Sequence, residues 1–227
     1  MLYIHILGWV YPVQTHWSWA DDGWMKNLYC NGDNCLSYAD FAGSGVVHVF
    51  GATCALIGCY FIGPRDGRFP KDGKAIDIPG HSVPLASLGG FILLFGFLAF
   101  NGGSQVIILS QKILHVVNMI LFFTETCVQL YFCNRTQLTI SNEGDAAAVG
   151  RAIVNTIIGG CGGGLSVLFV NKIFFNKVWS YLLTLNGALT GMVAMCAGCN
   201  VFEPWAALLV GVFSGAVFTA IRESMNR

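Results

Sequence analysis

Long uncharged apolar runs limit what this chain can fold into more than any other feature of its sequence. Phe41–Ile62 and Pro84–Ser104 contain no Asp, Glu, Lys or Arg, and each reaches the length of about 20 residues that crosses a bilayer core. The chain is 55% hydrophobic but only 11% charged, whereas soluble domains carry about 25% charge. These runs predict an all-α, polytopic helical membrane protein.

Six segments in all are apolar enough to form all or part of a spanning helix. Polar stretches separate them, among them Ala20–Ala39 and the charged loop Gly63–Pro79. Trp17, Trp19 and Trp24 suit a membrane–water interface, where amphipathic aromatic rings collect. The expected spans are Leu2–Trp19, Phe41–Ile62, Pro84–Ser104, Ala146–Val170, Tyr181–Ala197 and Trp205–Ile221.

Lysine and arginine residues indicate which side of the membrane is cytoplasmic. If the six spans alternate in direction and 106–137 is left aside, eight basic residues share one side, and only Lys26 and Arg151 lie on the other. The side with eight is therefore expected to be cytoplasmic, which places the loops around Cys30 and Glu203 outside. The eight are Arg65, Arg68, Lys71, Lys74, Lys172, Lys177, Arg222 and Arg227.

Charge and cysteine patterns argue against two other kinds of site. The net charge is zero and is spread over several loops, so no face for nucleic acid is expected. The nine cysteines show no zinc-binding spacing, and no metal or other cofactor is expected. Cys30 and Cys35 could form a disulfide if their loop faces an oxidising compartment. Cys196 and Cys199 have CxxC spacing, but their apolar surroundings favour membrane-buried small residues.

The stretch Asp40–His48, Asp-Phe-Ala-Gly-Ser-Gly-Val-Val-His, combines a carboxylate, small residues and a histidine at the start of an apolar run. Asp40 is placed to accept hydrogen bonds from the unpaired backbone donors of a first helical turn. His48 lies about 12 Å deeper along the helix axis. An ionisable side chain there is costly and usually faces a cavity or a partner. From these residues alone two interpretations stay open, a histidine that lines a pathway and a buried histidine bonded to a neighbouring carbonyl.

Ordered motifs make the chain similar to the ammonium transporter family (Amt/Mep/Rh), and most similar to its animal-type members. The motifs follow the order of the family's fifth, sixth, eighth and ninth helices, and any one of them alone would be weak evidence. They cover nearly all of the chain except Val106–Gln137. The motifs are Asp40–His48, Gly80–Pro84 with Gly96–Ser104, Asn186–Cys199, and Glu203–Ala207.

The resemblance implies a fold of eleven spanning helices in the plasma membrane, assembled as homotrimers or as heterotrimers with related subunits. Each subunit would hold a narrow pore for ammonium or ammonia, lined by two facing histidines below an aromatic gate and an outer aromatic cage. His48 matches the first pore histidine and Asp40 the family's essential aspartate. Trp19 matches the cage tryptophan, Ser104 the cage serine and Phe100 a gate phenylalanine.

The residue types suit the transport mechanism that the resemblance implies. A tryptophan face attracts a cation and a serine oxygen accepts a hydrogen bond, which together replace part of the hydration shell of ammonium. A neutral imidazole accepts a proton near physiological pH. The family mechanism is deprotonation, passage of ammonia along the histidine pair, and reprotonation. Asp40 would hold the helix start and favour positive charge nearby, whereas His81 is expected to cap or anchor the sixth helix.

The resemblance extends to only part of the family fold. Residues 1–105 resemble helices four to six and residues 138–227 resemble helices seven to nine, while 106–137 is an atypical apolar insert. The first three helices, and the tenth with the second pore histidine, have no counterpart. The chain is therefore expected to be an incomplete transporter, with a non-conducting or regulatory membrane subunit as the alternative.

The insert Val106–Gln137 has two explanations. One is a retained intron, because valine codons begin with GT, glutamine codons include CAG, and the family pattern resumes cleanly after 32 residues. The other is a re-entrant or extracellular insertion with Asn134 as a glycosylation acceptor in Asn-Arg-Thr. His115 and Glu125 fit a lipid-facing helix poorly.

An intramembrane enzyme is the least favoured function. Ser44 precedes His48 by four residues, but no third residue is placed to orient the histidine. The chain is therefore not expected to be an enzyme.

Overall fold

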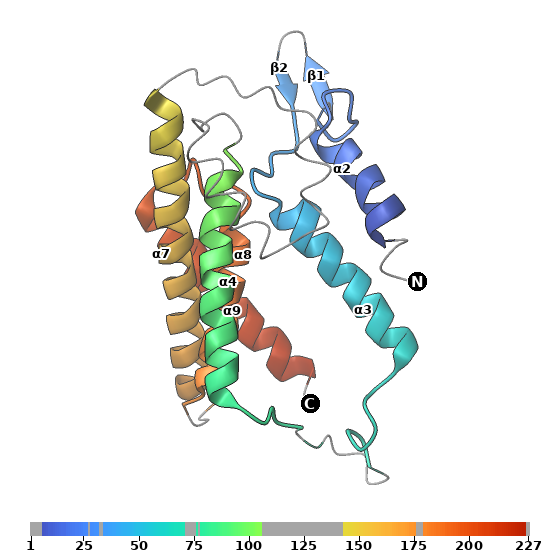
Figure 1. Cartoon of the computed structure of the whole chain (residues 1–227), viewed down its shortest axis with the longest axis vertical. Coiled ribbons are helices and arrows are strands. Elements are labelled where there is room, and N and C mark those ends of the chain that lie inside the picture. Colours follow the sequence, from blue (N-terminus) through green and yellow to red (C-terminus); the bar gives the residue numbers. More distant parts are fainter. Residues whose placement is uncertain are drawn as a thin grey trace.

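The structure, a computed structural model, is a group of long helices with a small hairpin at one end (Figure 1). Residues 29–31, 34–36 and 143–146 are described by their backbone alone. The insert 106–137 lies outside the described residues, so the structure does not test its two explanations. The described residues are 6–26, 28–31, 34–70, 76, 78–105, 143–175 and 179–225.

Helices occupy most of the described part of each of the six predicted spans, which confirms the helical membrane-protein class. A π-helical turn η1 (Ile6–Val10) precedes α2 (Tyr11–Trp19), and a second π-helical turn η2 (Ser44–Val49) leads into α3 (Phe50–Ile62). Four helices in the described part are long and apolar enough to cross a membrane, and α8 is a shorter apolar helix. The remaining helices are α4 (Val83–Gly103), α7 (Glu143–Ile173), α8 (Tyr181–Met195) and α9 (Pro204–Met225).

Within the described residues, the two strands lie in the polar loop between the first two spans. There β1 (Tyr29–Asn31) pairs antiparallel with β2 (Asn34–Leu36). The register places the backbone of Cys30 opposite that of Cys35. A three-residue hairpin in a polar loop does not alter the helical class of the fold.

Successive helices alternate in direction, and α4 and α7 do so across the insert. Gly102 near the end of α4 lies against Val149 and Ile153 near the start of α7, so the two helices meet at the same face of the protein. Figure 1 shows the end of α4 (green) and the start of α7 (yellow) together at the end that carries the hairpin. The alternation assumed for the charge argument is therefore present in the described helices.

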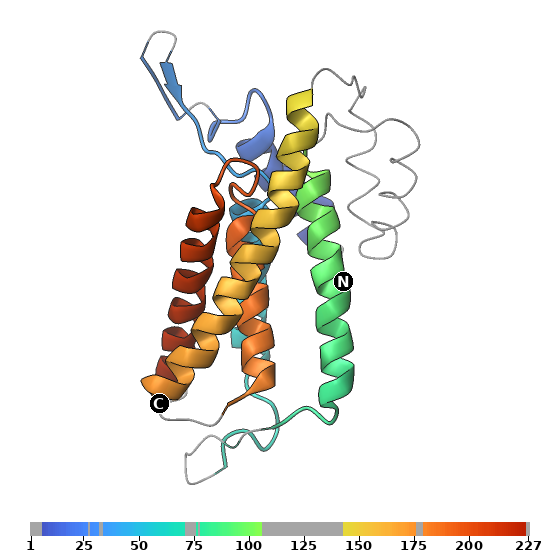
Figure 2. The ribbon, with the colours of Figure 1, turned by 90° about the vertical axis from the view of Figure 1, so that its left-hand side faces the viewer.

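Glycine allows α7 to approach both α8 and α9 at backbone distance. A Cβ atom added to Gly191 or to Gly211 would lie 2.2 Å from the carbonyl oxygen of Gly159. One turn along α7, a Cβ on Gly163 would lie 2.3 Å from the Gly187 oxygen. The pairs are spaced by four residues, as in the small-xxx-small pattern of membrane helices. Figure 2 shows α7 crossing obliquely in front of α8 and α9.

The described residues contain two buried apolar clusters. The first consists of Ala42, Phe97, Met192 and Cys196. The second consists of Ala152, Met195, Cys199 and Ala207 of α7, α8, the α8–α9 turn and α9. Cys196 and Cys199 are both 0% exposed and both carry free thiols, which agrees with buried small residues rather than a redox pair.

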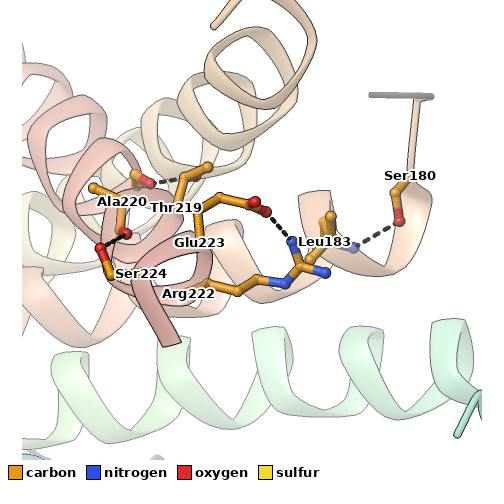
Figure 3. A network of polar contacts seen from close by, with 8 residues as sticks. Ser180, Leu183, Thr219, Ala220, Arg222, Glu223 and Ser224 are labelled. Atoms are coloured by element: carbon orange, nitrogen blue, oxygen red, sulfur yellow. Dashed lines mark hydrogen bonds and ion pairs between the residues drawn. The ribbon is translucent and has the colours of Figure 1, made fainter. Parts of the chain in front are cut away.

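Basic side chains gather at the end of the molecule opposite the hairpin. Arg65, Arg68 and Arg222 line one pocket of about 660 Å³ together with Ser180 at the start of α8. Figure 3 shows Glu223 turned toward Arg222, whose Nη1 donates to the Glu223 carboxylate over 2.8 Å. These three arginines belong to the group that the positive-inside rule places in the cytoplasm.

Serine residues begin the two helices that start at this basic end. The Ser82 hydroxyl accepts from the Leu85 backbone N–H at the start of α4 over 3.4 Å. Ser180 does the same for Leu183 at the start of α8. The expectation that His81 caps α4 is therefore wrong, because the Ser82 hydroxyl accepts from the Leu85 N–H, and His81 is exposed; that His81 anchors the helix stays a prediction.

Gly163→Ala is expected to destabilise the protein by about 1–3 kcal/mol, because the added methyl group has no room between α7 and α8. Gly150→Ala in the same helix is the matched control, since nothing lies within 4 Å of its added Cβ. The temperature at which the detergent-solubilised protein loses its monodisperse peak measures both. Equal midpoints for the two variants would contradict close backbone packing at Gly163.

Candidate functional site

Asp40 caps the helix that carries His48. Its Oδ1 accepts from the Ser44 backbone N–H over 2.7 Å, and its Oδ2 accepts from those of Gly45 and Val46, each over 2.8 Å. The residue is only 5% exposed. The predicted capping role is confirmed, although the helix begins at Ser44 rather than directly after Asp40. The carboxylate thus satisfies three backbone donors that no helical carbonyl reaches.

Two glycines make this cap sterically possible. Gly43 has φ of +87°, a backbone conformation that favours glycine. A Cβ on Gly45 would lie 2.1 Å from the Tyr38 hydroxyl oxygen and 3.4 Å from Asp40 Oδ2. Gly43 therefore turns the chain into the helix, and Gly45 leaves room for the side chains that bond to its end.

Tyr38 and Trp19 hold Asp40 from the hairpin side. The Tyr38 hydroxyl donates to Asp40 Oδ2 over 3.1 Å, and the Trp19 indole Nε1–H donates to the Asp40 carbonyl oxygen over 2.8 Å. Burial first, and then the negative charge and hydrogen bond of Asp40, raise the pKa of Tyr38 to about 12. The phenol therefore keeps its proton and acts as a donor at physiological pH.

The segment after Asp40 is bonded to the end of α8. The Phe41 N–H donates to the Ala197 carbonyl over 2.9 Å, and the Ala42 N–H donates to that of Cys196 over 2.7 Å. Ala42 and Cys196 also pack in the same buried cluster. The position of the cap therefore depends on the turn between α8 and α9.

His48 lies between the capped helix and α4. Its ring is stacked on Phe97 with centroids 5.5 Å apart, and it is tilted against Phe100 at 5.8 Å. Its Nε2 is shielded from solvent and has no hydrogen-bond partner among the described residues. Of the two interpretations of the sequence, a histidine bonded to a neighbouring carbonyl through Nε2 is not what this part of the structure contains.

Phe100 and Ser104 lie one turn apart on α4. The Ser104 hydroxyl donates to the Phe100 carbonyl oxygen over 2.7 Å, so its proton is engaged and its oxygen lone pairs can accept a hydrogen bond. Through Phe100, Ser104 is connected to the ring that touches His48.

Four of the five predicted site residues therefore form two directly linked pairs. Trp19 bonds to Asp40, and His48 contacts Phe100, while Ser104 bonds to the Phe100 backbone. Among the described residues, no group of three or more His, Cys, Asp and Glu side chains could hold a metal ion. The arrangement offers an unpaired imidazole nitrogen beside aromatic rings.

Sequence reasoning missed Phe97 and a buried polar group on α7. Phe97 is three residues before Phe100, and this spacing alone places the two on one helix face. Asn155 and Thr156, both 0% exposed, bond to the α8–α9 turn and to Asn101 of α4. Paired polar residues in an apolar span were the available signal for this second group.

Comparison with known proteins places these features in a family. The sequence profile of the Ammonium Transporter Family matches residues 1–138 and 134–225. The chain belongs to the ammonium transporter family. It is 40% identical over 220 residues to "Putative ammonium transporter 1" of Caenorhabditis elegans, covering 96% of this chain and 35% of that protein. It is 38% identical over 214 residues to "Ammonium transporter 1 member 1" of Arabidopsis thaliana, covering 93% and 38%.

Solved structures of the family share the fold. The crystal structure of Candida albicans Mep2 superposes with a TM-score of 0.69 at 22% identity, covering 99% of this chain and 39% of that one. A "Sensor Amt Protein" gives 0.66 at 25% identity, covering 95% and 44%. The chain spans less than half the length of these relatives. Family membership and the apolar helices make it a multi-pass membrane protein.

Asp40→Asn is expected to lower the free energy of unfolding by about 1–3 kcal/mol, because an amide group cannot accept from all the donors that face the carboxylate. Asp66→Asn is the control, since Asp66 is exposed in the loop after α3. Thermal unfolding followed by tryptophan fluorescence measures both. A variant as stable as the control would show that the cap contributes little to the fold.

Proposed function

We propose that this chain is part of a transporter that moves ammonium or ammonia across the membrane. The observation that carries the proposal is the His48 imidazole, whose shielded Nε2 has no partner in the described part of the chain and whose ring packs on Phe97 and Phe100. An ionisable group kept unpaired inside an apolar span is costly and is typical of a substrate pathway. The names of the two relatives, both ammonium transporters, support the substrate.

Trp19 and Ser104 would recruit the cation at the outer mouth. The Trp19 N–H is engaged by Asp40, which leaves the ring face for cation–π attraction. The Ser104 hydroxyl donates to Phe100 and keeps its oxygen lone pairs for an N–H donor of the substrate. Asp40 would favour positive charge nearby without direct contact, because its carboxylate oxygens already accept four hydrogen bonds.

His48 would act on the substrate after it passes the aromatic rings. A neutral imidazole nitrogen accepts a proton or a hydrogen bond from ammonium, so that the uncharged species continues through the apolar part of the pathway. Phe100 would form part of the gate above His48, since the two rings are in contact. In this proposal ammonia takes up a proton from water at the other side of the membrane, and His48 releases the proton that it accepted before the next cycle.

Assembly and location complete the proposal. Many large apolar side chains of α3 are exposed within this chain, including Leu56, Phe61 and Ile62. They are suited to contact with lipid or with other protein segments. We propose a plasma-membrane protein that works as a homotrimer or as a heterotrimer with related subunits.

Cellular uptake of methylammonium tests the function. The parent chain is expected to exceed an empty-vector control, and His48→Ala is expected to lower uptake at least about tenfold, because a positioned proton acceptor contributes about 10²–10⁴-fold. His81→Ala is the matched control, since His81 is exposed before α4.

Two outcomes would contradict this proposal in different ways. Parent uptake equal to the empty vector would show that this chain does not conduct by itself. Parent uptake with an unchanged His48→Ala variant would remove His48 from the pathway.

The two parts of the chain on either side of the insert are proposed as one transporter unit, 1–105 with helices resembling family helices four to six and 138–227 with seven to nine. The profile matches in two pieces, 1–138 and 134–225, so the match breaks near the end of the insert, while its first piece runs across 106–137. We propose that 106–137 is a retained intron.

Sequencing the transcript tests this origin of the insert. The dominant mRNA is expected to lack the 96 nucleotides that encode the 32 residues 106–137, at three per residue. A dominant mRNA that retains them would make the insert a genuine part of the protein.

A further inference from the structure

Two adjacent buried residues of α7 bond to the segments on either side of the His48–Phe100 contact. Asn155 bonds to the α8–α9 turn, and Thr156 bonds to α4. Asn155 and Thr156 touch neither His48 nor Phe100 through any hydrogen bond or ring contact in the described part of the chain, and both are 0% exposed. The side chain of each residue forms a hydrogen bond with a segment outside α7. We propose that they are positioning residues that fix the gap between the His48 and Phe100 rings, and with it the size of the cation that passes.

Asn155 holds the His48 side through the α8–α9 turn. Its Nδ2 donates to the carbonyl oxygens of Cys199 over 2.8 Å and of Phe202 over 2.6 Å. The same turn begins with the carbonyls of Cys196 and Ala197, which accept from the backbone immediately after Asp40. Asp40 in turn bonds to the first N–H groups of the helix with His48. Three hydrogen-bonded steps thus connect α7 to the helix that carries the histidine.

Thr156 bonds to Asn101, the residue that follows Phe100 on α4. Its Oγ1 accepts from Nδ2 of Asn101 over 2.8 Å and donates to the Ala152 carbonyl over 2.7 Å. Asn101 is 0% exposed, and its Oδ1 has no partner among the described residues. The Asn101 amide, next to Phe100 on α4, is therefore held by Thr156 and also interacts with the Cys196 side chain.

Because Asn155 and Thr156 are consecutive, one segment of α7 sets both distances. A change at either residue moves one ring relative to the other, although neither side chain lines the gap. In a rigid packed interior such small shifts are transmitted rather than absorbed. The effect on selectivity rests on the proposed transport function, whereas the effect on ring position does not.

Thr156→Val and Asn155→Leu test the proposal, since both keep approximate side-chain volume and remove the hydrogen bonds between helices. Thr156→Ser restores the hydroxyl. Thr219→Val is the matched control, because Thr219 is 2% exposed and its hydroxyl donates to Gly215 within its own helix. All four variants are made in the full chain.

The first readout is the imidazole ¹⁵N resonance of His48 in histidine-labelled protein in lipid nanodiscs, assigned by its loss in His48→Ala. Ring contacts at 5.5 and 5.8 Å make this resonance sensitive to Phe97 and Phe100. Thr156→Val and Asn155→Leu are expected to displace it, whereas Thr156→Ser and Thr219→Val leave it in place. An undisplaced resonance in both Thr156→Val and Asn155→Leu overturns the proposal, whether or not the chain conducts.

The second readout is the ratio of methylammonium to ammonium uptake. Thr156→Val is expected to change this ratio about fivefold, the factor that one lost hydrogen bond contributes, and Thr156→Ser is expected to restore it. A changed amount of protein at the surface with an unchanged ratio would show a structural role only and would overturn the positioning role. A parent without uptake would overturn the transport function but leave the resonance test decisive.

Discussion

Backbone contact between glycines is the constraint on which the rest of the structure depends. α7 meets α8 at Gly191 and α9 at Gly211 through the same carbonyl, that of Gly159. In a membrane, helices gain little from hiding apolar surface from lipid, so they associate through close packing and hydrogen bonds. Because glycine has no Cβ atom, the three helices can converge on one turn of α7. This convergence brings the polar residues of α7 within hydrogen-bonding distance of α4 and of the α8–α9 turn.

A second constraint is the supply of hydrogen-bond partners where the chain bends. At Asp40, backbone donors at a helix start, a phenol and an indole all converge on one residue that is nearly excluded from solvent. Unpaired groups there would each be costly. His48 is the contrast, since its Nε2 stays unpaired in the described part of the chain. In the described part of the chain the groups around Asp40 are therefore bonded, whereas His48 Nε2 beside the aromatic rings is not, and neither are the amide oxygens of Asn101 and Asn155.

Much of this arrangement could be predicted from the sequence. Uncharged runs of bilayer length locate the helices, and an aspartate four residues before Ser44 at the start of such a run predicts its cap. Sequence patterns did not predict hydrogen bonds between residues that are distant in the sequence. The sequence contains Asn101 and Thr156, but it does not indicate that residues 55 positions apart share a hydrogen bond. The sequence also did not show which of two adjacent residues caps α4. Ser82 rather than His81 accepts from the backbone donor at the start of that helix.

The shared face of the end of α4 and the start of α7 has a consequence for how this gene can vary. Gly102 and Val149 are in contact at that face, so the described helices on either side of 106–137 are already joined in space. A protein in which Gln105 is followed directly by residue 138 would keep every described helix in its present orientation, and its basic end would stay on the same side of the membrane. Products of alternative transcripts that differ only here would therefore share one orientation of the described helices.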